Sequence, residues 1–417
     1  MKVLFVVKSK VIETLGPQYL AAVVKKCGHD AKICDILDAE IVAGVWEPDV
    51  IGYSIHTGDR EKFMKLNEAL KTHLSFTSIV GGADVTFFPQ GYDWADHIVQ
   101  GEGENWMAEF LGSKIQYPDL DSIPHPDRTD FRDMAIRDFI ASRGCTNTCA
   151  YCYTSAWNNM YPELAKIRFR SAKDVINEVT LIQPQFAYFQ DSTFGTNIKW
   201  LRDFCREYGM KLRIPFHVHL RPNMVTQERV QLLADAGCVS VKIALETSSN
   251  RLRKLINRGH TNNEDVYTAS RLLRKEKIAL ILQNMIGIPS ATIEDDLETL
   301  EVNIKCHPAY AWVSIYQPYP STPLAEFCEK EGYYDGNYSE IGDNFFDKSV
   351  LNIPNKHKEQ VACLQRIFAF CVETQVMPEV SDLTWKRLPK FIHNAMRKVG
   401  DRRMFPGIIS SPGQPEN

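Results

Sequence analysis

Three cysteines stand close together near the middle of the 417-residue chain. They are Cys145, Cys149 and Cys152, in the segment Gly-Cys-Thr-Asn-Thr-Cys-Ala-Tyr-Cys that begins at Gly144. Spacings of four and three residues let one loop turn all three sulfurs toward a single metal centre. A zinc site ordinarily has a fourth cysteine or histidine at a similar short spacing, and none follows here. Three thiolates without a fourth ligand favour an iron-sulfur cluster with one iron open to a substrate or cofactor.

Two other interpretations of these cysteines stay open: an ordinary buried trio, and a structural zinc site completed by a distant ligand. The remaining cysteines are scattered singly, as expected of small buried residues in a reducing compartment. They are Cys27, Cys34, Cys205, Cys238, Cys306, Cys328, Cys363 and Cys371.

Composition narrows the class of protein further. Forty-eight basic and 52 acidic residues leave a net charge of -4, so bulk binding to nucleic acid is not expected. The apolar run at the start is too short for a signal peptide, and the longest apolar stretch, 278–289, is interrupted by Gln283 and Asn284. We therefore expect a cytoplasmic protein without a membrane span.

The elements that position the cysteines come from an alternation of strands and helices that begins just before them. Six βα units of this length predict a partial parallel barrel, whose site faces the carboxyl ends of the strands. The expected strands are 138–142, 186–190, 212–219, 239–245, 279–286 and 312–316, and the expected helices are 172–182, 198–208, 227–236, 264–275 and 293–306.

A similar alternation over residues 1–112 predicts a separate α/β domain with a doubly wound, Rossmann-like parallel sheet. Its strands are expected at 2–7, 31–35, 49–54, 78–81 and 97–99, and its helices at 16–27 and 60–73. The loops 54–59, 81–86 and 100–104 contain glycine, which suits either a bulky ligand or simply tight turns. No G-x-G-x-x-G follows the first strand, so a dinucleotide is not indicated.

The rest of the chain divides around these two domains. Residues 113–135 are rich in proline and aspartate and are expected to form a linker, and the barrel is expected to occupy 136–332. Residues 333–417 read as a small helical region, with helices near 359–374 and 385–399 and a frayed end.

The cysteine segment resembles the signature of radical S-adenosylmethionine (radical SAM) enzymes, Cys-x3-Cys-x-aromatic-Cys, and Ser142-Arg143-Gly144 before it is also typical of them. The resemblance implies a [4Fe-4S] cluster on Cys145, Cys149 and Cys152. Its fourth iron would chelate S-adenosyl-L-methionine, whose reductive cleavage gives a 5'-deoxyadenosyl radical. Tyr151 would lie against the adenine.

The same resemblance implies further S-adenosylmethionine contacts at successive strand ends. Alone, each of these polar residues is better explained as a helix cap or a surface ion pair, but their recurrence at successive strand ends favours the implied contacts. The implied contacts are Gln190, Asp191, Ser192, Arg221 and Glu246. No contact is carried over from Ser290-Ala291-Thr292, which departs from the family's usual Gly-Glu-Thr. His56, His217 and His219 are expected to be polar residues near the cavity rather than metal ligands.

With such a barrel behind it, the first domain resembles the cobalamin-binding domain of the cobalamin-dependent subgroup. The likeness is carried by segments 16–20, 48–52, 81–89 and 101–104, although the Asp-x-His-x-x-Gly that places a histidine below cobalt is absent. The resemblance implies cobalamin as a cofactor, with contacts from Thr57, Gly58, Gly81, Gly82, Thr86, Gly101, Glu102 and Gly103.

Together these observations predict a cobalamin-dependent radical SAM enzyme, in the first place a C-methyltransferase acting on an unactivated carbon. The expected partners are a small-molecule or peptide substrate and a one-electron reductant of the flavodoxin or ferredoxin type. Alternatives are a radical SAM cyclase or rearrangement enzyme, and a non-catalytic cobalamin or metal-binding protein. A methylthiotransferase is disfavoured because residues 1–112 contain only Cys27 and Cys34. The sequence assigns no catalytic side chain and no substrate.

Overall fold

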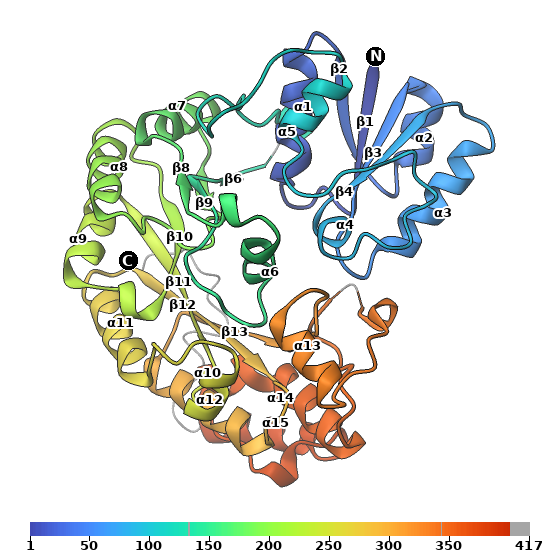
Figure 1. The fold of residues 1–417 in the computed structure, drawn as a ribbon. Helices are drawn as coiled ribbons and strands as arrows, with labels where there is room; N and C mark the ends of the chain where they lie inside the picture. Colours follow the sequence, from blue (N-terminus) through green and yellow to red (C-terminus); the bar gives the residue numbers. More distant parts are fainter. Residues whose placement is uncertain (132–133, 343, 401–417) are drawn as a thin grey trace.

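The computed structural model describes residues 1–131, 134–342 and 344–400, and the side chains up to residue 396. Two parallel sheets dominate these residues, one near the start of the chain and one in its middle (Figure 1). They confirm the predicted fold class of a doubly wound domain followed by a partial barrel. The predicted frayed end, from residue 401, lies outside the described residues.

The first sheet has five parallel strands in the order β2-β1-β3-β4-β5, the arrangement expected of a doubly wound fold. Its strands are β1 (Lys2–Val7), β2 (Asp30–Asp35), β3 (Val50–Ser54), β4 (Thr77–Gly81) and β5 (His97–Ile98). Its helices are α1 (Leu15–Lys26), α2 (Ala39–Trp46), α3 (Arg60–Lys71), α4 (Ala83–Phe87) and α5 (Glu104–Phe110). We did not predict α2, α4 or α5.

Both faces of this sheet are covered, because successive side chains of a strand point to opposite sides. Val3 and Phe5 pack with α1 and α5 on one face, and Leu4 and Val6 pack with α2 and α3 on the other. The carboxyl ends of the strands are therefore the accessible edge of the first domain, and the three glycine-containing loops lie there.

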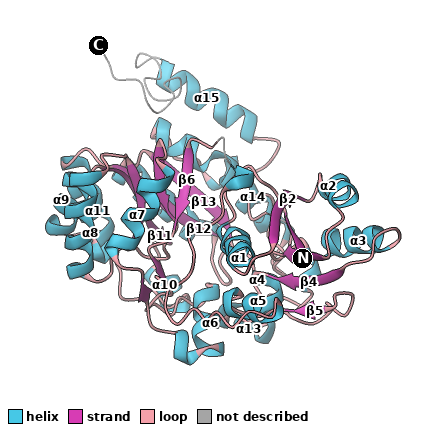
Figure 2. Ribbon diagram, turned by 90° about the horizontal axis from the view of Figure 1, so that it is seen from above, coloured by secondary structure: helices cyan, strands magenta, loops and turns pink. Residues whose placement is uncertain are grey.

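The second sheet has six parallel strands in the order β13-β12-β11-β10-β9-β6 and curls into a half-barrel, with helices along its outer side (Figures 1 and 2). Its strands are β6 (Ile136–Phe139), β9 (Phe186–Phe189), β10 (Phe216–Leu220), β11 (Cys238–Glu246), β12 (Ala279–Ile286) and β13 (Tyr310–Ile315). The outer helices are α7 (Ala172–Ile182), α8 (Ile198–Lys211), α9 (Gln227–Asp235), α11 (Asn263–Lys275) and α12 (Ile293–Cys306).

Each outer helix begins at a polar residue whose side chain accepts a hydrogen bond from the first turn. Such a cap is worth about 1 kcal/mol, because it satisfies an N–H group that has no partner within the helix. The capping residues are Ser171, Asn197, Thr226, Asn262 and Thr292. These caps explain why the predicted helix starts agree with the structure to within one residue.

Two predicted strands need correction. The strand expected at 138–142 is divided into β6 and a short β7 (Ser142–Arg143), which pairs antiparallel with β8 (Arg168–Phe169). The strand expected from residue 212 begins only at Phe216, because Arg213 has a φ of 49° and Pro215 has no N–H to donate.

The C-terminal region packs against the last barrel strand. Helix α14 (Asn355–Thr374) buries Val361, Leu364 and Phe368 against residues of β13 and α12. Helices α13 (Pro323–Lys330) and α15 (Leu388–Gly400) complete the region. The domain divisions at residues 112, 135 and 332 stay predictions.

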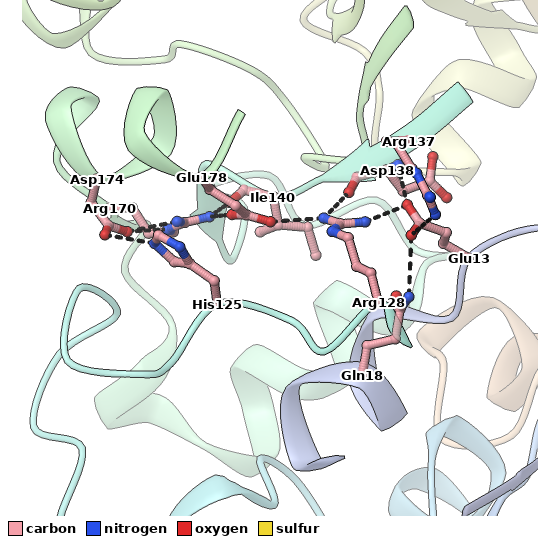
Figure 3. A network of polar contacts seen from close by, with 10 residues as sticks. All are labelled: Glu13, Gln18, His125, Arg128, Arg137, Asp138, Ile140, Arg170, Asp174 and Glu178. Atoms are coloured by element: carbon pink, nitrogen blue, oxygen red, sulfur yellow. Dashed lines mark hydrogen bonds and ion pairs between the residues drawn. The ribbon is translucent and has the colours of Figure 1, made fainter. Parts of the chain in front are cut away.

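Buried ion pairs join the first domain, the linker and the barrel (Figure 3). Arg128 of the linker contacts Glu13, which lies just before α1, and Glu178 of α7. Arg170 also contacts Glu178, at 2.5 Å, and Arg137 of β6 contacts Glu13, at 3.1 Å. Charges this deeply buried are tolerated only when paired, so the network holds the two domains in one relative position.

Among the described residues, no helix combines the length and the apolar character that crossing a bilayer requires.

Candidate active site

The three cysteines lie in a loop between β7 and α6 (Tyr153–Met160) and line a single cavity of about 240 Å³ at the carboxyl ends of the barrel strands. Gly144 opens the loop with a φ of +96°, and a Cβ there would lie 3.1 Å from the carbonyl oxygen of Lys166. Ala150 anchors the loop: its N–H donates to Ile256 and its carbonyl accepts from Leu324. Distant elements therefore fix how the sulfurs are presented.

Polar groups approach two of the sulfurs. The Asn147 amide donates to Cys145 Sγ at 3.2 Å, and an Arg258 guanidinium nitrogen lies 3.9 Å from Cys149 Sγ. An amide donor and a guanidinium group therefore lie beside two of the sulfurs that would bind iron. Nowhere in the described part of the chain do three His, Cys, Asp or Glu side chains close around a single metal ion.

The cavity also contains His219 and Glu246, but both are already engaged. Glu246 accepts a hydrogen bond from Tyr151 at 2.8 Å, and His219 contacts the Tyr188 hydroxyl at 3.0 Å. The donor set thus amounts to three soft thiols without a fourth available ligand. These residues fit a multi-iron cluster with one open position better than a closed zinc site.

Glu246 lies at a distorted strand end. The pairing of β11 with β12 shifts register between Ala244 and Glu246, and Glu246 itself has a φ of 62°. A bulge and a left-handed backbone cost free energy and occur often at functional sites, where they redirect a side chain. Burial raises the pKa of the Glu246 carboxyl, while Arg258 and the Tyr151 hydroxyl beside it act in the opposite direction.

Arg258 holds this arrangement together. It lies 3.3 Å from the Tyr151 hydroxyl and donates to the carbonyl oxygen of Ala244 at 2.6 Å. Arg258 is not predictable from the sequence, because it follows α10 (Asn250–Leu255) in a turn that shows no pattern of its own. Only the fold brings its guanidinium between Cys149, Tyr151 and Glu246.

The other predicted S-adenosylmethionine contacts take different positions. Arg221 and Ser192 line the cavity, and Arg221 also contacts the ring of His260. Burial and the neighbouring Arg258 lower the pKa of Arg221. Gln190 is exposed and is not among the cavity's lining residues.

Asp191 is buried and faces the backbone rather than the cavity. Its carboxylate accepts from the N–H of Ala141 at 3.0 Å and from the hydroxyl of Ser142 at 2.5 Å. Burial raises its pKa to about 6, against these hydrogen bonds. In this structure Asp191 therefore supports the turn from β6 into β7.

A second cavity, a groove of about 330 Å³, lies between the first domain and the barrel. Arg143 and Trp157 close it from the barrel side. Five of the eight predicted cobalamin contacts line it: Gly81, Gly82, Gly101, Glu102 and Gly103.

Two glycines of this groove leave little room for a side chain. Gly101 has a φ of +81°, and a Cβ there would lie 3.2 Å from the Tyr161 hydroxyl oxygen. A Cβ on Gly103 would lie 3.2 Å from a methyl group of Leu20. Because the backbone itself forms the wall, a large flat ligand can approach it closely. The groove, mostly apolar and lined by glycine, fits a corrin.

The other three predicted cobalamin residues do not line the groove. Thr57 contacts the Tyr153 hydroxyl at 2.6 Å, and a Cβ on Gly58 would lie 2.6 Å from the carbonyl oxygen of Gly342. Thr86 donates to Gly82 and accepts from the N–H of Gly101. Thr86 shapes the glycine loops, whereas Thr57 and Gly58 contact the barrel and the C-terminal region.

Helix α6 lies between the first domain and the half-barrel (Figure 1). Residues of this helix line both cavities. Its Trp157 lines the groove, while Cys152 and Thr154 at its start line the cysteine cavity. Tyr153 stacks on Phe87 of the first domain with ring centroids 4.2 Å apart. A ligand at the thiols and a ligand in the groove would thus be separated by a single helix.

Comparison with known proteins agrees with this arrangement. A family model described as the radical SAM superfamily matches residues 139–302, and one described as the B12 binding domain matches residues 1–111. Fold and site thus define a radical SAM enzyme with a half-barrel. The chain belongs to the radical SAM enzymes that carry a cobalamin-binding domain, which confirms the predicted family.

Individual relatives are distant. The chain is 24% identical to an uncharacterized methyltransferase of Pyrococcus horikoshii over 375 residues, which cover 76% of this chain and 80% of the relative. It is also 24% identical to the anaerobic magnesium-protoporphyrin IX monomethyl ester cyclase of Cereibacter sphaeroides, covering 73% of this chain and 58% of that protein.

Among solved structures, the chain is similar to the radical S-adenosylmethionine methyltransferase TsrM of Kitasatospora setae, which was solved with cobalamin and a [4Fe-4S] cluster bound. The TM-score is 0.67 at 16% identity, over 79% of this chain and 75% of that one. At this identity the similarity concerns the fold.

Proposed function

We propose that this protein is a cobalamin-dependent radical SAM C-methyltransferase that acts on an unactivated carbon. The observation that carries the proposal is helix α6, which directly follows the loop of the three cysteines and Tyr151 and places Trp157 in the groove of the first domain. A cluster site and a corrin site set this close suit a substrate carbon that must meet both cofactors in turn.

Cys145, Cys149 and Cys152 would hold the cluster, and Gly81, Gly82, Gly101, Glu102 and Gly103 would form the bed of the corrin. When bound, the cluster would supply the electron that cleaves S-adenosylmethionine, and cobalamin would carry the methyl group. Glu102 is fixed by Arg168 and by Arg143, the latter at 3.4 Å. These two ion pairs restrict the position of the Glu102 side chain.

S-adenosylmethionine would be held by Tyr151, Ser192, Arg221 and Glu246 in the cysteine cavity, with Arg258 as an additional contact. Arg221 and Arg258 present guanidinium groups that suit a carboxylate, and Glu246 presents an acceptor that suits hydroxyl or ammonium groups. Gln190 and Asp191 would act from outside this cavity, Asp191 by holding the turn that leads to the cysteines.

The aromatic contacts around α6 would keep water from the reaction. Tyr153 packs between Phe87 and Tyr319, with ring centroids 4.2 Å and 5.3 Å away. A reactive carbon radical must be shielded from solvent, and rings packed at the domain junction provide such a shield.

A cyclase is the second candidate, because a relative bears that name. Product mass separates the two functions, since methylation adds about 14 Da and cyclisation adds no methyl group. The proposed external partner is a one-electron reductant of the flavodoxin or ferredoxin type. A reducing, cytoplasmic setting is supported by the eleven cysteines, all of which are free thiols.

Anaerobically reconstituted protein tests the proposal. We expect about four irons per chain and one bound cobalamin, and 5'-deoxyadenosine when S-adenosylmethionine and dithionite are added. Cys145→Ala, Cys149→Ala and Cys152→Ala should each lose iron and 5'-deoxyadenosine formation. Cys205→Ala, a buried cysteine of α8, is the control and should keep both. Zinc in place of iron, or no 5'-deoxyadenosine from the wild type, would refute the proposal.

A further inference from the structure

Polar side chains face the interior of the half-barrel, and two of them, His219 and Lys242, line the cysteine cavity. On β9, β10 and β11 the inward positions include Tyr188, His217, His219 and Lys242, and His219 lies directly opposite Lys242 in the strand pairing. Tyr188 stacks on His217 with ring centroids 4.3 Å apart. Parallel barrels are usually filled with branched apolar residues, so this group is unusual for a core.

Three of these residues form a directional chain of hydrogen bonds. Lys242 Nζ donates to the Tyr188 hydroxyl at 3.0 Å, so the Tyr188 proton is free to donate to His219 Nε2, also at 3.0 Å. His219 makes its remaining hydrogen bond with the backbone of Asp191. The Tyr188 hydroxyl and the His219 ring thus have hydrogen-bond partners on both sides, and they fix the position of the Lys242 ammonium group.

Lys242 lacks the counter-charge that the other cations of the cavity have. Arg258 lies beside Glu246 and Cys149, and Arg221 interacts electrostatically with Cys145 and Cys149. Among the described residues Lys242 makes no ion pair, and burial alone lowers its pKa. An ammonium group has three N–H donors, and one of them is used here.

A second unused donor lies next to it. Gln283 of β12 lines the same cavity and faces inward one strand away, and its pairing partner is Ala244, two residues beyond Lys242. Its amide makes no hydrogen bond to another described residue. Both side chains line the same cavity from neighbouring strands, where an ammonium and an amide can each donate to an anionic oxygen group.

We propose that Lys242 and Gln283 bind an anionic group of the substrate, a carboxylate or a phosphate, on the floor of the cysteine cavity. This inference rests on the proposed function, because it places the substrate in the cavity that holds the cluster thiols. It narrows the substrate to small molecules or peptides that carry such a group, and it makes Tyr188 and His219 positioning residues. The other anion that could reach this floor is the carboxylate of S-adenosylmethionine.

Chemical labelling of Lys242 tests the inference without turnover. The reconstituted protein is treated with an amine-acylating reagent at pH 8, and the labelling rate of each lysine is followed by peptide mass spectrometry. Inorganic phosphate or acetate should slow the labelling of Lys242 at least about threefold relative to chloride at equal ionic strength. Exposed Lys277 is the internal control and should not respond. In Gln283→Leu the protection should weaken.

A second experiment distinguishes an anionic group of the substrate from the carboxylate of S-adenosylmethionine. Decarboxylated S-adenosylmethionine should leave the protection by phosphate or acetate intact. The inference is overturned if neither anion protects Lys242, or if S-adenosylmethionine protects it while its decarboxylated form and the simple anions do not. This result does not depend on methyl transfer, so a failure to form 5'-deoxyadenosine refutes the proposed function while the labelling still decides the role of Lys242.

Discussion

Arg128 of the linker lies 2.7 Å from Glu178 of α7, and both side chains are almost wholly buried. The same guanidinium contacts Glu13 of the first domain, so one side chain ties together three parts of the chain (Figure 3). Since the groove and the cysteine cavity lie on either side of α6, their relative position depends on how the two domains are held.

Replacing Arg128 by Met should destabilise the protein by about 3–5 kcal/mol, because it leaves the buried carboxylates Glu13 and Glu178 without this partner. The free energy of unfolding from urea denaturation measures the effect. Arg202→Met removes an exposed pair with Glu228 and should cost less than about 1 kcal/mol. Equal losses in the two variants would show that the buried network does not stabilise the domain arrangement.

Gly101 should control cobalamin binding. A leucine there would point toward Tyr161 and Trp157 in a left-handed backbone, so Gly101→Leu is expected to lower the cobalamin retained after gel filtration at least about tenfold. Gly112→Leu is a matched control, because Gly112 has a similar φ of +72° but open space around its Cβ. Cobalamin absorbance measures the retention, and comparable losses in both variants would point to backbone strain rather than crowding of the groove.

Arg258 should be required for binding S-adenosylmethionine. Arg258→Met removes the cation beside buried Glu246 and the donor to Ala244, so the Kd should rise at least about tenfold. Anaerobic calorimetry measures the Kd, and iron content checks that the cluster persists. Arg251→Met, which removes a more exposed pair with Asp295, should bind as the wild type does. An unchanged Kd in Arg258→Met, with iron retained, would place S-adenosylmethionine elsewhere.

Asp296 should make stability depend on pH. Burial raises the pKa of this α12 carboxyl from 3.8 to about 8, so the folded protein holds its proton to higher pH than the unfolded chain does. The stability that this proton contributes is complete below about pH 4 and is lost as the pH rises through 8. Asp296→Asn removes this pH-dependent loss of stability, and the amide oxygen of the asparagine can still accept the hydrogen bond from the N–H of Gly287.

Urea denaturation between pH 4 and pH 8 measures this effect. The free energy of unfolding of the wild type should fall relative to that of Asp296→Asn by on the order of 2–4 kcal/mol over this range. Asp295→Asn is the neighbouring control. Because the pKa of Asp295 is lowered, removing this carboxylate should not abolish the fall in the free energy of unfolding between pH 4 and pH 8. Parallel pH curves for the wild type and Asp296→Asn would contradict the assignment.

Local patterns explain why much of the fold was predictable. Strands β1, β9 and β12 are short apolar or alternating runs bounded by turn residues, and the barrel helices begin at Ser, Thr or Asn caps. The error at 212–216 has an equally local cause that periodicity alone does not reveal, namely the left-handed Arg213 and the proline that follows.

The three cysteines, their spacing and the strand before them were determined by the sequence alone, because four- and three-residue separations restrict what a single loop can do. Tertiary structure decided the rest of the site. Arg258 and Lys242 lie about 100 residues after the cysteines in the chain, and no local pattern marks either of them. Their charges acquire a role only when the curled sheet brings them to the cavity that the three cysteines line.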